Sequence, residues 1–597
     1  MCGIAGYIGK ENSKTELLQL IKGVEYRGYD SAGIACINNN SIEVIKSAGA
    51  VSNLENILGF PVTNSCGIAH TRWATHGKAN SINAHPHLSQ DKNWAIVHNG
   101  IIENYLPLKN DLIQNHNINF KSETDTETIA HLLQVSNKHN SLEALKFACD
   151  KLIGSYALAV ISTHNPHEIC VARNESPLYV AYGSNGNYIA SDPICFVGKC
   201  AEYYTLNNNE YARITENTIE FFDNNLIPID KTPTKMNFEV EDAGLGNYNH
   251  FMQKEISQEK DVINRLISTY QDSKVFEKLN TKELESINNI ILIGCGTAYH
   301  AALMGARMLE KYARIKSSAY IASEFRYSNP IIDKDTLAIF VSQSGETADT
   351  LGALEIVKAN NTHTIALTNV LYSTLAKNSD YIFPVCAGPE LAVASTKAYT
   401  AQISVLYLFA NYLATIKFNK DYKALENLSK FLLTSDNYFD QIKELSIKLT
   451  SASNVFFIGR DTDYITAEEA SLKLKEITYI NSSAYPSGEL KHGFLALVDS
   501  NTILFVVATE KHLLDKTLNA AHEAYARGAK IVVVSNLDIS QDKLHDIYLN
   551  IHLDDLGEDI MPMTAIKFFQ WLAYYTSTTK DINPDKPRNL AKSVTVE

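Results

Sequence analysis

Short runs of apolar residues recur along the first 240 residues, and only two helical patterns interrupt them. Such runs, bounded by polar turns, are typical of β-strands. They lie at residues 4–8, 32–37, 66–70, 94–98, 157–161, 169–172 and 188–191, and the helical patterns lie near residues 13–22 and 125–135. This part of the chain is therefore predicted to form stacked sheets with helices outside.

A different pattern begins beyond residue 280, where buried strand patterns alternate with helical ones. The strands are predicted at residues 289–293, 319–323, 336–341 and 364–368, with helices at 301–312 and 348–358. This alternation predicts a doubly wound parallel sheet. Strand patterns at residues 454–460, 502–508 and 530–536 repeat the same spacing, which indicates a duplicated half.

The apolar periodicity is lost over residues 229–249. This segment has prolines at its start and two glycines near its end, which is typical of a domain boundary. The predicted division has a domain over residues 1–240, a linker with an entry helix over 241–280, repeated domains over 281–450 and 451–586, and a tail over 587–597.

Composition excludes several classes of protein. The chain has 53 Lys and Arg against 67 Asp and Glu, a net charge of -14, so no general field attracts it to nucleic acid or an anionic membrane. No signal-peptide pattern opens it, and no apolar run reaches the ~18 residues of a membrane span. Nine cysteines without a C-x-x-C pair indicate neither disulfides nor a metal site, and the cytoplasm is the expected location.

The first residues suggest a catalytic nucleophile. Removal of Met1 would leave Cys2 with a thiol and an α-amine, and an α-amine titrates at about 7.7–8.0. Polar stretches supply what amide hydrolysis needs: a carboxylate clamp in Arg72, an ammonium partner in Asp125, and oxyanion donors in Asn99-Gly100. Alternatives stay open at this point, namely a hairpin turn at Asn99-Gly100, a helix cap at residues 122–127 and a surface stack of Arg72 and Trp73.

Together these stretches make residues 1–240 similar to the class II glutamine amidotransferase domain, which has the N-terminal nucleophile hydrolase fold. The resemblance implies a four-layer αββα sandwich with Cys2 as the nucleophile and Asn99 and Gly100 as the oxyanion hole. The residues that would bind glutamine or close a loop over it are Arg72, Trp73, Thr75, His76 and Asp125.

A loop rich in hydroxyls follows the predicted strand at 336–341 and opens the helix at 348–358. It reads Ser342-Gln343-Ser344-Gly345-Glu346-Thr347. A helix N-terminus with added hydroxyl donors suits a phosphate group, although an ordinary Ser/Thr cap is the alternative. The second repeat has Thr509-Glu510-Lys511 at this place, so one phosphate site is predicted, in the first repeat.

The duplicated half resembles two sugar isomerase (SIS) domains, and nearly the whole chain resembles the family of glutamine–fructose-6-phosphate aminotransferases. The matching stretches are residues 323–327, 342–350, 393–398, 472–477, 488–493 and 587–597. Two positions depart from the family pattern: Ala298 stands where serine is usual, and Phe494 replaces a usual proline.

The same resemblance assigns roles in the sugar chemistry. Glu476 would move a proton from carbon 1 to carbon 2, with Lys473 as its charge partner, although such a pair on a helix is otherwise a solvated one. His492 would open the ring, reaching in from a neighbouring subunit, and Lys592 would form the imine. Phosphate would be held by Ser342, Gln343, Ser344 and Thr347, and the sugar pocket lined by Thr297, Val393, Ser395 and Ala591.

The implied activity converts glutamine and fructose 6-phosphate to glutamate and glucosamine 6-phosphate, with no metal or organic cofactor. Ammonia would need a closed passage, for which Trp73 is the expected gate. The expected partners are these two small molecules and a second copy of the chain, a homodimer without nucleic acid or membrane. Two alternatives are a class II amidotransferase acting on phosphoribosyl pyrophosphate and a regulator that senses sugar phosphates.

Overall fold

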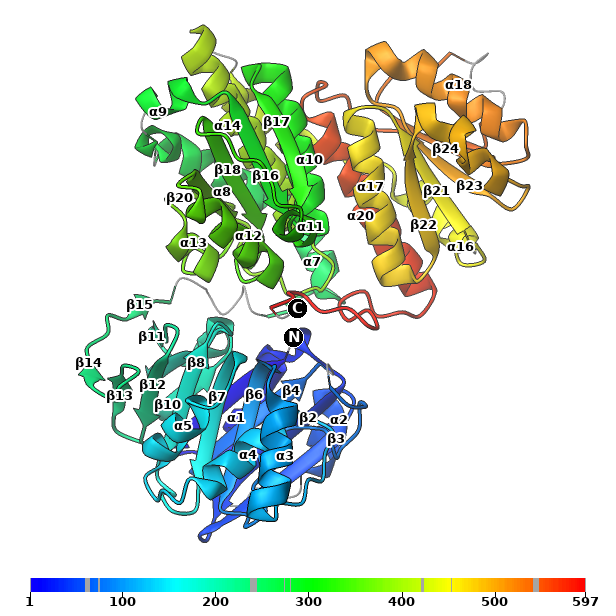
Figure 1. Cartoon of the computed structure of the whole chain (residues 1–597). Helices are drawn as coiled ribbons and strands as arrows, with labels where there is room; N and C mark the ends of the chain where they lie inside the picture. The colour runs from blue at the N-terminus through cyan, green and yellow to red at the C-terminus, as the bar shows by residue number, and fades with distance from the viewer. Residues whose placement is uncertain are drawn as a thin grey trace. The chain divides into compact units, whose positions relative to one another are not determined.

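The computed structural model of the chain describes residues 2–58, 65–73, 76–236, 244–272, 274–279, 281–419, 423–452, 454–540 and 547–595. Its contacts divide the chain into two compact units (Figure 1). The first unit comprises Met1–Gly244 with Ala591–Glu597, and the second comprises Leu245–Leu590. The finer division into five parts stays a prediction.

Two antiparallel sheets form the centre of the first unit. The eight-stranded sheet has the order β15-β11-β9-β10-β1-β4-β2-β3 and the seven-stranded sheet the order β14-β13-β12-β8-β7-β6-β5. The strands of the first are β1 Gly3–Gly9, β2 Ser31–Asn38, β3 Ser41–Ala48, β4 Cys66–Arg72, β9 Tyr179–Gly183, β10 Gly186–Ala190, β11 Glu202–Thr205 and β15 Thr234–Lys235. Those of the second are β5 His87–Leu88, β6 Trp94–Ile102, β7 Gly154–Ser162, β8 Ile169–Asn174, β12 Glu210–Ile214, β13 Ile219–Phe222 and β14 Pro228–Ile229.

Both faces of strand β6 are buried, which shows how the layers are built. Ala95 and Val97 pack into the core shared with the other sheet, whereas Trp94 and Ile96 pack with the helices. Helices α1 (Ser13–Gly23) and α2 (Val51–Ile57) cover the eight-stranded sheet, and α4 (Thr126–Val135) and α5 (Ser141–Cys149) cover the other. The predicted αββα sandwich is confirmed.

The predicted elements of this unit match the observed ones, with omissions. Six of the seven predicted strand runs lie wholly in a strand, and the run at 188–191 extends one residue past β10. The two predicted helices correspond to α1 and α4. Helix α3 (Tyr105–His116) was not predicted, because Leu112 is its single buried residue and the sequence therefore lacks an apolar stripe. Asn117, in the left-handed conformation at φ 56°, ends this helix.

The second unit contains two five-stranded parallel sheets with matching strand orders, β17-β16-β18-β19-β20 and β22-β21-β23-β24-β25. This confirms the predicted duplication and the doubly wound class. The first sheet consists of β16 Asn289–Gly294, β17 Lys316–Ile321, β18 Thr336–Ser342, β19 His363–Thr368 and β20 Tyr381–Pro384. The second consists of β21 Asn454–Gly459, β22 Asn481–Pro486, β23 Ile503–Val507, β24 Lys530–Ser535 and β25 Leu549–His552.

Helices cover both faces of each sheet in the second unit. They are α7 Phe251–Ser257, α8 Glu259–Asp272, α9 Thr281–Ser286, α10 Thr297–Met308, α11 Ala322–Tyr327, α12 Ala348–Ala359, α13 Thr374–Asn378, α14 Lys397–Phe418, α15 Ala424–Ser429, α16 Phe439–Leu449, α17 Thr462–Thr478, α18 Leu514–Tyr525 and α20 Met561–Thr579. Helices α14 and α20 are buried over most of their length in the core that joins the two sheets. Within the described ranges, no helix is both long and apolar enough to span a membrane.

The strand predicted at residues 319–323 is misplaced, and β17 shows why. This strand lies at the edge of its sheet and begins earlier, at Lys316, with polar residues that give no strand pattern. Ala322 already belongs to helix α11. An edge strand has fewer covered positions than a central one, so its sequence signals it weakly.

The core of the first unit holds several buried histidines. His70, His85, His87 and His98 are each at most 4% exposed, and the rings of His70 and His85 stack at a centroid distance of 4.2 Å. Burial lowers the pKa of all four imidazoles, that of His70 to about 3. These side chains are therefore neutral in the folded chain at neutral pH.

These neutral imidazoles predict acid-sensitive stability of the first unit. Below about pH 6.5 the unfolded chain takes up protons that the folded core excludes, so stability falls as pH falls, by up to about 1.4 kcal/mol per imidazole and pH unit. For His70 this loss continues until its folded pKa of about 3. Urea unfolding of a Trp571→Phe variant can measure it, because the remaining tryptophans, Trp73 and Trp94, lie in the first unit. Equal stability at pH 7 and pH 5 would contradict the prediction.

Candidate active site

Cys2 lies directly before strand β1, beside the residue that follows strand β4. The pairing of β1 with β4 sets Gly3 opposite Thr71, which brings the Trp73 backbone to Cys2. The Trp73 N–H donates to Cys2 Sγ at 3.3 Å. Burial raises the pKa of the Cys2 thiol above its ordinary value, while the Trp73 N–H and the Arg72 guanidinium act to lower it. The sheet register therefore provides the thiol with groups that favour the thiolate.

Asn99 and Gly100 lie inside strand β6, so the hairpin-turn alternative is wrong. The Asn99 Nδ2 group donates to the Cys2 backbone oxygen at 3.0 Å. Gly100 has a φ of 134°, and a Cβ there would lie 2.0 Å from the backbone oxygen of Ser155 on β7. Only glycine fits this position. The structure thus brings Asn99 to Cys2, as an oxyanion hole requires.

The predicted glutamine-binding residues Arg72 and Asp125 belong to different elements of the first unit. Arg72 ends β4, is 3% exposed and donates to the backbone oxygens of His76 and Lys78. Asp125 precedes α4 without capping it, and its Oδ2 accepts from the Ile102 N–H at 2.9 Å. Asp125 thus stands at the N-cap position of α4, but a helix cap at residues 122–127 does not explain its carboxylate.

Trp73 and His76, two further residues of the predicted glutamine loop, each pack against a tyrosine ring. Trp73 packs edge-on against Tyr29 at 5.8 Å between ring centroids, and His76 packs edge-on against Tyr105 at 5.4 Å. Thr75 lies outside the described residues. These contacts leave the roles of Trp73 and His76 towards glutamine as predictions.

In the second unit, helix α17 presents three ionisable side chains on one face. Glu469, Lys473 and Glu476 follow at helical spacing, and Lys473 is 1% exposed. Its Nζ lies 2.6 Å from Glu476 Oε2 and 3.4 Å from Glu469 Oε1. Burial alone lowers the pKa of Lys473, but the two carboxylates outweigh it and raise the pKa. The surface-pair alternative for Lys473 and Glu476 is therefore wrong.

Thr297, at the start of α10, joins this face to the first sheet. Its hydroxyl accepts from Lys473 Nζ at 3.0 Å and donates to Glu469 Oε1 at 3.0 Å. Glu469 Oε2 also lies 2.7 Å from His300 Nδ1. Sequence reasoning missed Glu469 and His300. The signal was present in their spacing, because Glu469 stands four residues before Lys473 and His300 three after Thr297.

The hydroxyl loop begins at Ser342, the last residue of β18, and ends at Thr347, directly before α12, as predicted. Ser342 Oγ accepts from the Gly345 N–H at 3.0 Å, and Ser344 Oγ from the Glu346 N–H at 3.2 Å. Gly345 has a φ of 65°, and a Cβ there would lie 2.1 Å from Ser373 Oγ. Thr347 occupies the cap position of α12 yet makes no side-chain cap hydrogen bond. The ordinary-cap alternative therefore does not explain Thr347.

The other predicted sugar-site residues make contacts that do not by themselves assign a role. Ser395 donates its hydroxyl to Glu390 Oε2 at 2.8 Å, and the Val393 N–H donates to the Asp585 backbone oxygen at 3.1 Å. His492 ends the 3₁₀ segment Ser487–His492 and is exposed. Ala591 and Lys592 belong to the first compact unit. Their roles in the sugar site stay predictions.

Phe494 and Ala298 are the two departures from the family pattern. Phe494 is 4% exposed and packs against Phe456 at 4.8 Å between ring centroids, so it fills the core of the second repeat. Ala298 lies in the first turn of α10 and donates its N–H to the Cys295 backbone oxygen. Both residues therefore lie in regular helical segments.

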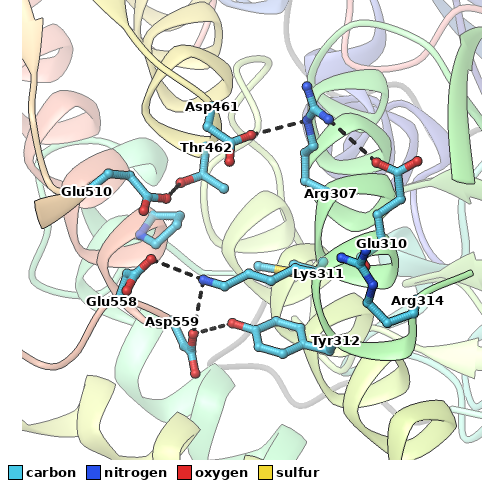
Figure 2. Close-up of a pocket in the computed structure, with 12 residues that line it drawn as sticks. Arg307, Glu310, Lys311, Tyr312, Arg314, Asp461, Thr462, Glu510, Glu558 and Asp559 are labelled. Carbon is cyan, nitrogen blue, oxygen red and sulfur yellow. Dashed lines mark hydrogen bonds and ion pairs between the residues drawn. The ribbon is translucent and has the colours of Figure 1, made fainter. Parts of the chain in front are cut away.

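A cavity of about 250 Å³ at the ends of β21 and β23 is lined by residues of both repeats (Figure 2). Glu510, which stands in place of the hydroxyl loop, accepts from Thr462 Oγ1 at 2.5 Å. Burial raises the pKa of Glu510 to about 7, and the adjacent Glu558 adds to the shift. Lys311 reaches in from the first repeat and pairs with Glu558 and Asp559. The cavity is also lined by the cationic Arg307, Lys311 and Arg314 of the first repeat, so the single phosphate site stays a prediction.

Comparison with protein families matches both units. The SIS domain model matches residues 283–412 and 448–565. The glutamine amidotransferase domain model matches residues 70–197. Among solved structures, the C-terminal domain of glucosamine-fructose-6-phosphate aminotransferase from Francisella tularensis superposes with a TM-score of 0.54 at 32% identity, over 57% of this chain and 99% of that chain.

Curated relatives match the chain over its full length. The glutamine–fructose-6-phosphate aminotransferase (isomerizing) of Caldanaerobacter subterraneus subsp. tengcongensis is 44% identical over 618 residues, and that of Clostridium acetobutylicum is 40% identical over 611 residues. In both cases the match covers 100% of this chain and 100% of the relative. The chain belongs to the family of glutamine–fructose-6-phosphate aminotransferases (isomerizing), which are enzymes.

Proposed function

We propose that the chain converts L-glutamine and D-fructose 6-phosphate to L-glutamate and D-glucosamine 6-phosphate. The observation that carries this proposal is that one chain contains both a Cys2–Asn99 site and a buried Lys473 paired with Glu476, together with a hydroxyl loop at the end of β18. The full-length similarity to curated relatives supports the same reaction. This activity is the first step towards activated amino sugars.

In the first half-reaction, the Cys2 thiolate attacks the side-chain amide of glutamine. The negative charge that develops on the amide oxygen is stabilised by the Asn99 amide and the Gly100 N–H. The Cys2 α-amine, free after removal of Met1, takes the thiol proton during the attack and gives it to the leaving nitrogen, so collapse of the intermediate releases ammonia and leaves a thioester. Water then hydrolyses the thioester to glutamate and restores the thiol. Arg72 binds the carboxylate of glutamine and Asp125 its ammonium, with Trp73, Thr75 and His76 closing over them.

In the second half-reaction, the hydroxyl loop binds the phosphate through Ser342, Gln343, Ser344 and Thr347. His492 opens the sugar ring, and the Lys592 amine condenses with the carbonyl at carbon 2, releasing water. Ammonia then displaces Lys592 from this imine. Glu476 takes the proton from carbon 1 and returns it to carbon 2, which yields the amino aldehyde. Lys473 holds Glu476 in place, and the pocket is lined by Thr297, Val393, Ser395 and Ala591.

We further propose that the enzyme works as a homodimer in the cytoplasm, without a metal, an organic cofactor, nucleic acid or a membrane. The exposure of His492 supports the dimer, because a side chain that acts in the site of a partner must be accessible. The net charge of -14 agrees with partners other than nucleic acid. The five-part domain division is part of this proposal.

A sugar-phosphate-sensing regulator is the alternative from another class. A product assay with purified protein, glutamine and fructose 6-phosphate separates the two. Formation of glucosamine 6-phosphate and glutamate in equal amounts supports the enzyme. Binding of fructose 6-phosphate without either product would support the regulator.

Cys2→Ala is expected to abolish glutamine-dependent synthesis and to preserve synthesis from ammonium salts. Loss of a covalent nucleophile lowers kcat by at least about 1,000-fold, whereas free ammonia bypasses this step. Cys200→Ala, at another partly buried cysteine of the same unit, is the matched control and should retain glutamine use. Glutamine-dependent synthesis by Cys2→Ala would overturn the role of Cys2.

Glu476→Gln is expected to lower the synthesis of glucosamine 6-phosphate by about 100- to 10,000-fold, because an amide of the same shape cannot carry the proton. Glutamine hydrolysis should persist. Glu468→Gln, on the same helix, is the control, since Glu468 accepts a hydrogen bond from Tyr464 and is not assigned a role. Exchange of the carbon 1 proton with solvent should disappear in Glu476→Gln, and its survival would assign the proton transfer to another group.

A further inference from the structure

The side-chain amide of Asn99 lies between the nucleophile and a buried histidine. Its Nδ2 donates to the Cys2 backbone oxygen at 3.0 Å, and its Oδ1 lies 3.0 Å from His70 Nε2. The same Nε2 atom lies 2.9 Å from the backbone oxygen of His98. Asn99 is 3% exposed and His70 is fully buried. Water therefore does not compete for these contacts.

These contacts fix the tautomer of His70. A backbone carbonyl oxygen can only accept, so the Nε2 atom that faces His98 must carry the hydrogen. That N–H also points at Asn99, and it can be satisfied there only by the amide oxygen. A flipped amide would set N–H groups against each other. The hydrogen-bond network thus determines which end of the Asn99 amide faces Cys2.

We propose that His70 is a positioning residue for glutamine hydrolysis, whose Nε2–H holds the Asn99 amide with its NH₂ group towards Cys2. This inference rests on the proposed function of the first unit. The NH₂ group has two hydrogens. One bonds the Cys2 backbone oxygen, and the other is left for the oxyanion that forms when Cys2 attacks.

The neutral form of His70 is the form that this role needs. Burial lowers the pKa of His70 to about 3, and the hydrogen bonds to Asn99 and His98 only partly oppose this shift. Within the described part of the chain, the Nδ1 atom of His70 makes no hydrogen bond, so a second proton there would be unsatisfied. The imidazole therefore acts as a fixed donor rather than as an acid or base.

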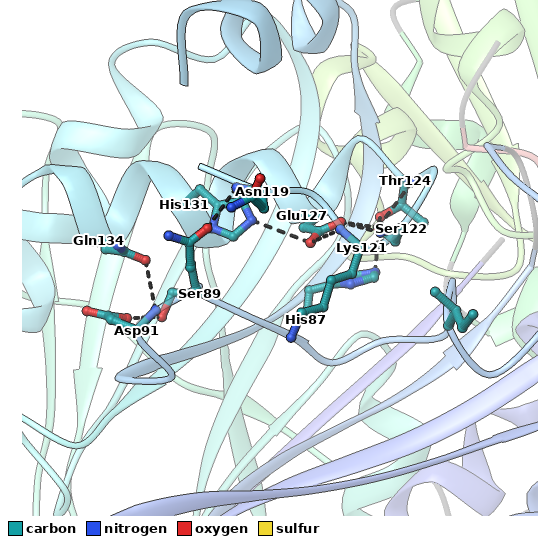
Figure 3. Close-up of polar contacts among 12 residues, drawn as sticks. His87, Ser89, Asp91, Asn119, Lys121, Ser122, Thr124, Glu127, His131 and Gln134 are labelled. Carbon is teal, nitrogen blue, oxygen red and sulfur yellow. Dashed lines mark hydrogen bonds and ion pairs between the residues drawn. The ribbon is translucent and has the colours of Figure 1, made fainter. Parts of the chain in front are cut away.

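A row of rings holds the imidazole of His70 in place. His70 stacks on His85 at 4.2 Å, and His85 meets His87 edge-on at 4.9 Å. His87 Nε2 lies 3.0 Å from Thr124 Oγ1, whose hydroxyl lies 2.9 Å from that of Ser122 (Figure 3). The row thus connects the oxyanion side of the site with the segment directly before Asp125.

The test compares two substitutions of His70 in the full-length protein. His70→Leu removes the donor, whereas His70→Gln places a side-chain N–H near the position of Nε2. His131→Leu is the matched control, because His131 is an equally buried imidazole whose contacts are Glu127 and Phe120. The measurements are kcat and KM for glutamine hydrolysis, synthesis from ammonium salts, and the rate of Cys2 alkylation by iodoacetamide.

We expect His70→Leu to lower kcat for glutamine hydrolysis by about 10- to 100-fold with less than about a threefold change in KM, because the oxyanion exists only after attack. Alkylation of Cys2 and ammonia-dependent synthesis should stay near the wild-type rates, since displacement of iodide forms no oxyanion. His70→Gln should recover most of kcat, and His131→Leu should retain it.

Three results would overturn the inference. They are wild-type kcat in His70→Leu, an equal loss of kcat and of Cys2 alkylation, and a His70→Gln variant no better than His70→Leu. Failure of the proposed synthase reaction is a separate result. It would appear as wild-type protein that hydrolyses glutamine without forming glucosamine 6-phosphate, and the comparison at His70 would still decide this inference.

Discussion

Burial of both faces of the central strands is the constraint on which the remaining structure depends. In β6 of the first unit and β16 of the second, successive side chains enter different hydrophobic cores. A polar group in the middle of such a strand loses water and needs a hydrogen-bond partner in the core. Three of the candidate residues avoid this cost at strand ends, since Cys2 precedes β1, Arg72 ends β4 and Ser342 ends β18. Asn99 lies inside β6 instead, and its amide is hydrogen-bonded to Cys2 and His70.

Two buried polar side chains near these ends are tolerated for different reasons. His70 is kept neutral, so that it behaves as a hydrogen-bond donor without the cost of a buried charge. Lys473 keeps its charge, because Glu469 and Glu476 lie beside it and Thr297 accepts one of its hydrogens. A neutral group can fix the orientation of a neighbour, whereas a charged one also sets the proton affinity of the carboxylates around it.

The sequence predicted the architecture well, because strand patterns in a fully buried sheet depend on local composition. It also predicted that Cys2 and Asn99 belong to one site, and the structure brings the two residues into contact. It did not identify Glu469 or His300, whose importance comes from contacts with Thr297 and Lys473 across a long stretch of chain. His70 was missed for a similar reason, since within its strand it reads as one more core position. Contacts that join distant segments leave no periodic pattern in a single sequence.

The two repeats of the second unit share a backbone turn, but the side chains around it differ. Gly296 and Asp461 have nearly the same backbone angles, with φ 54° and 52°, at the start of α10 and α17. The helix after Asp461 carries Lys473 and Glu469 to Thr297 of the other repeat, while its own sheet end holds carboxylates. The cluster of Thr297, Glu469 and Lys473 is thus built from both repeats, and neither repeat alone contains all three side chains. The two halves of the duplication are therefore not interchangeable.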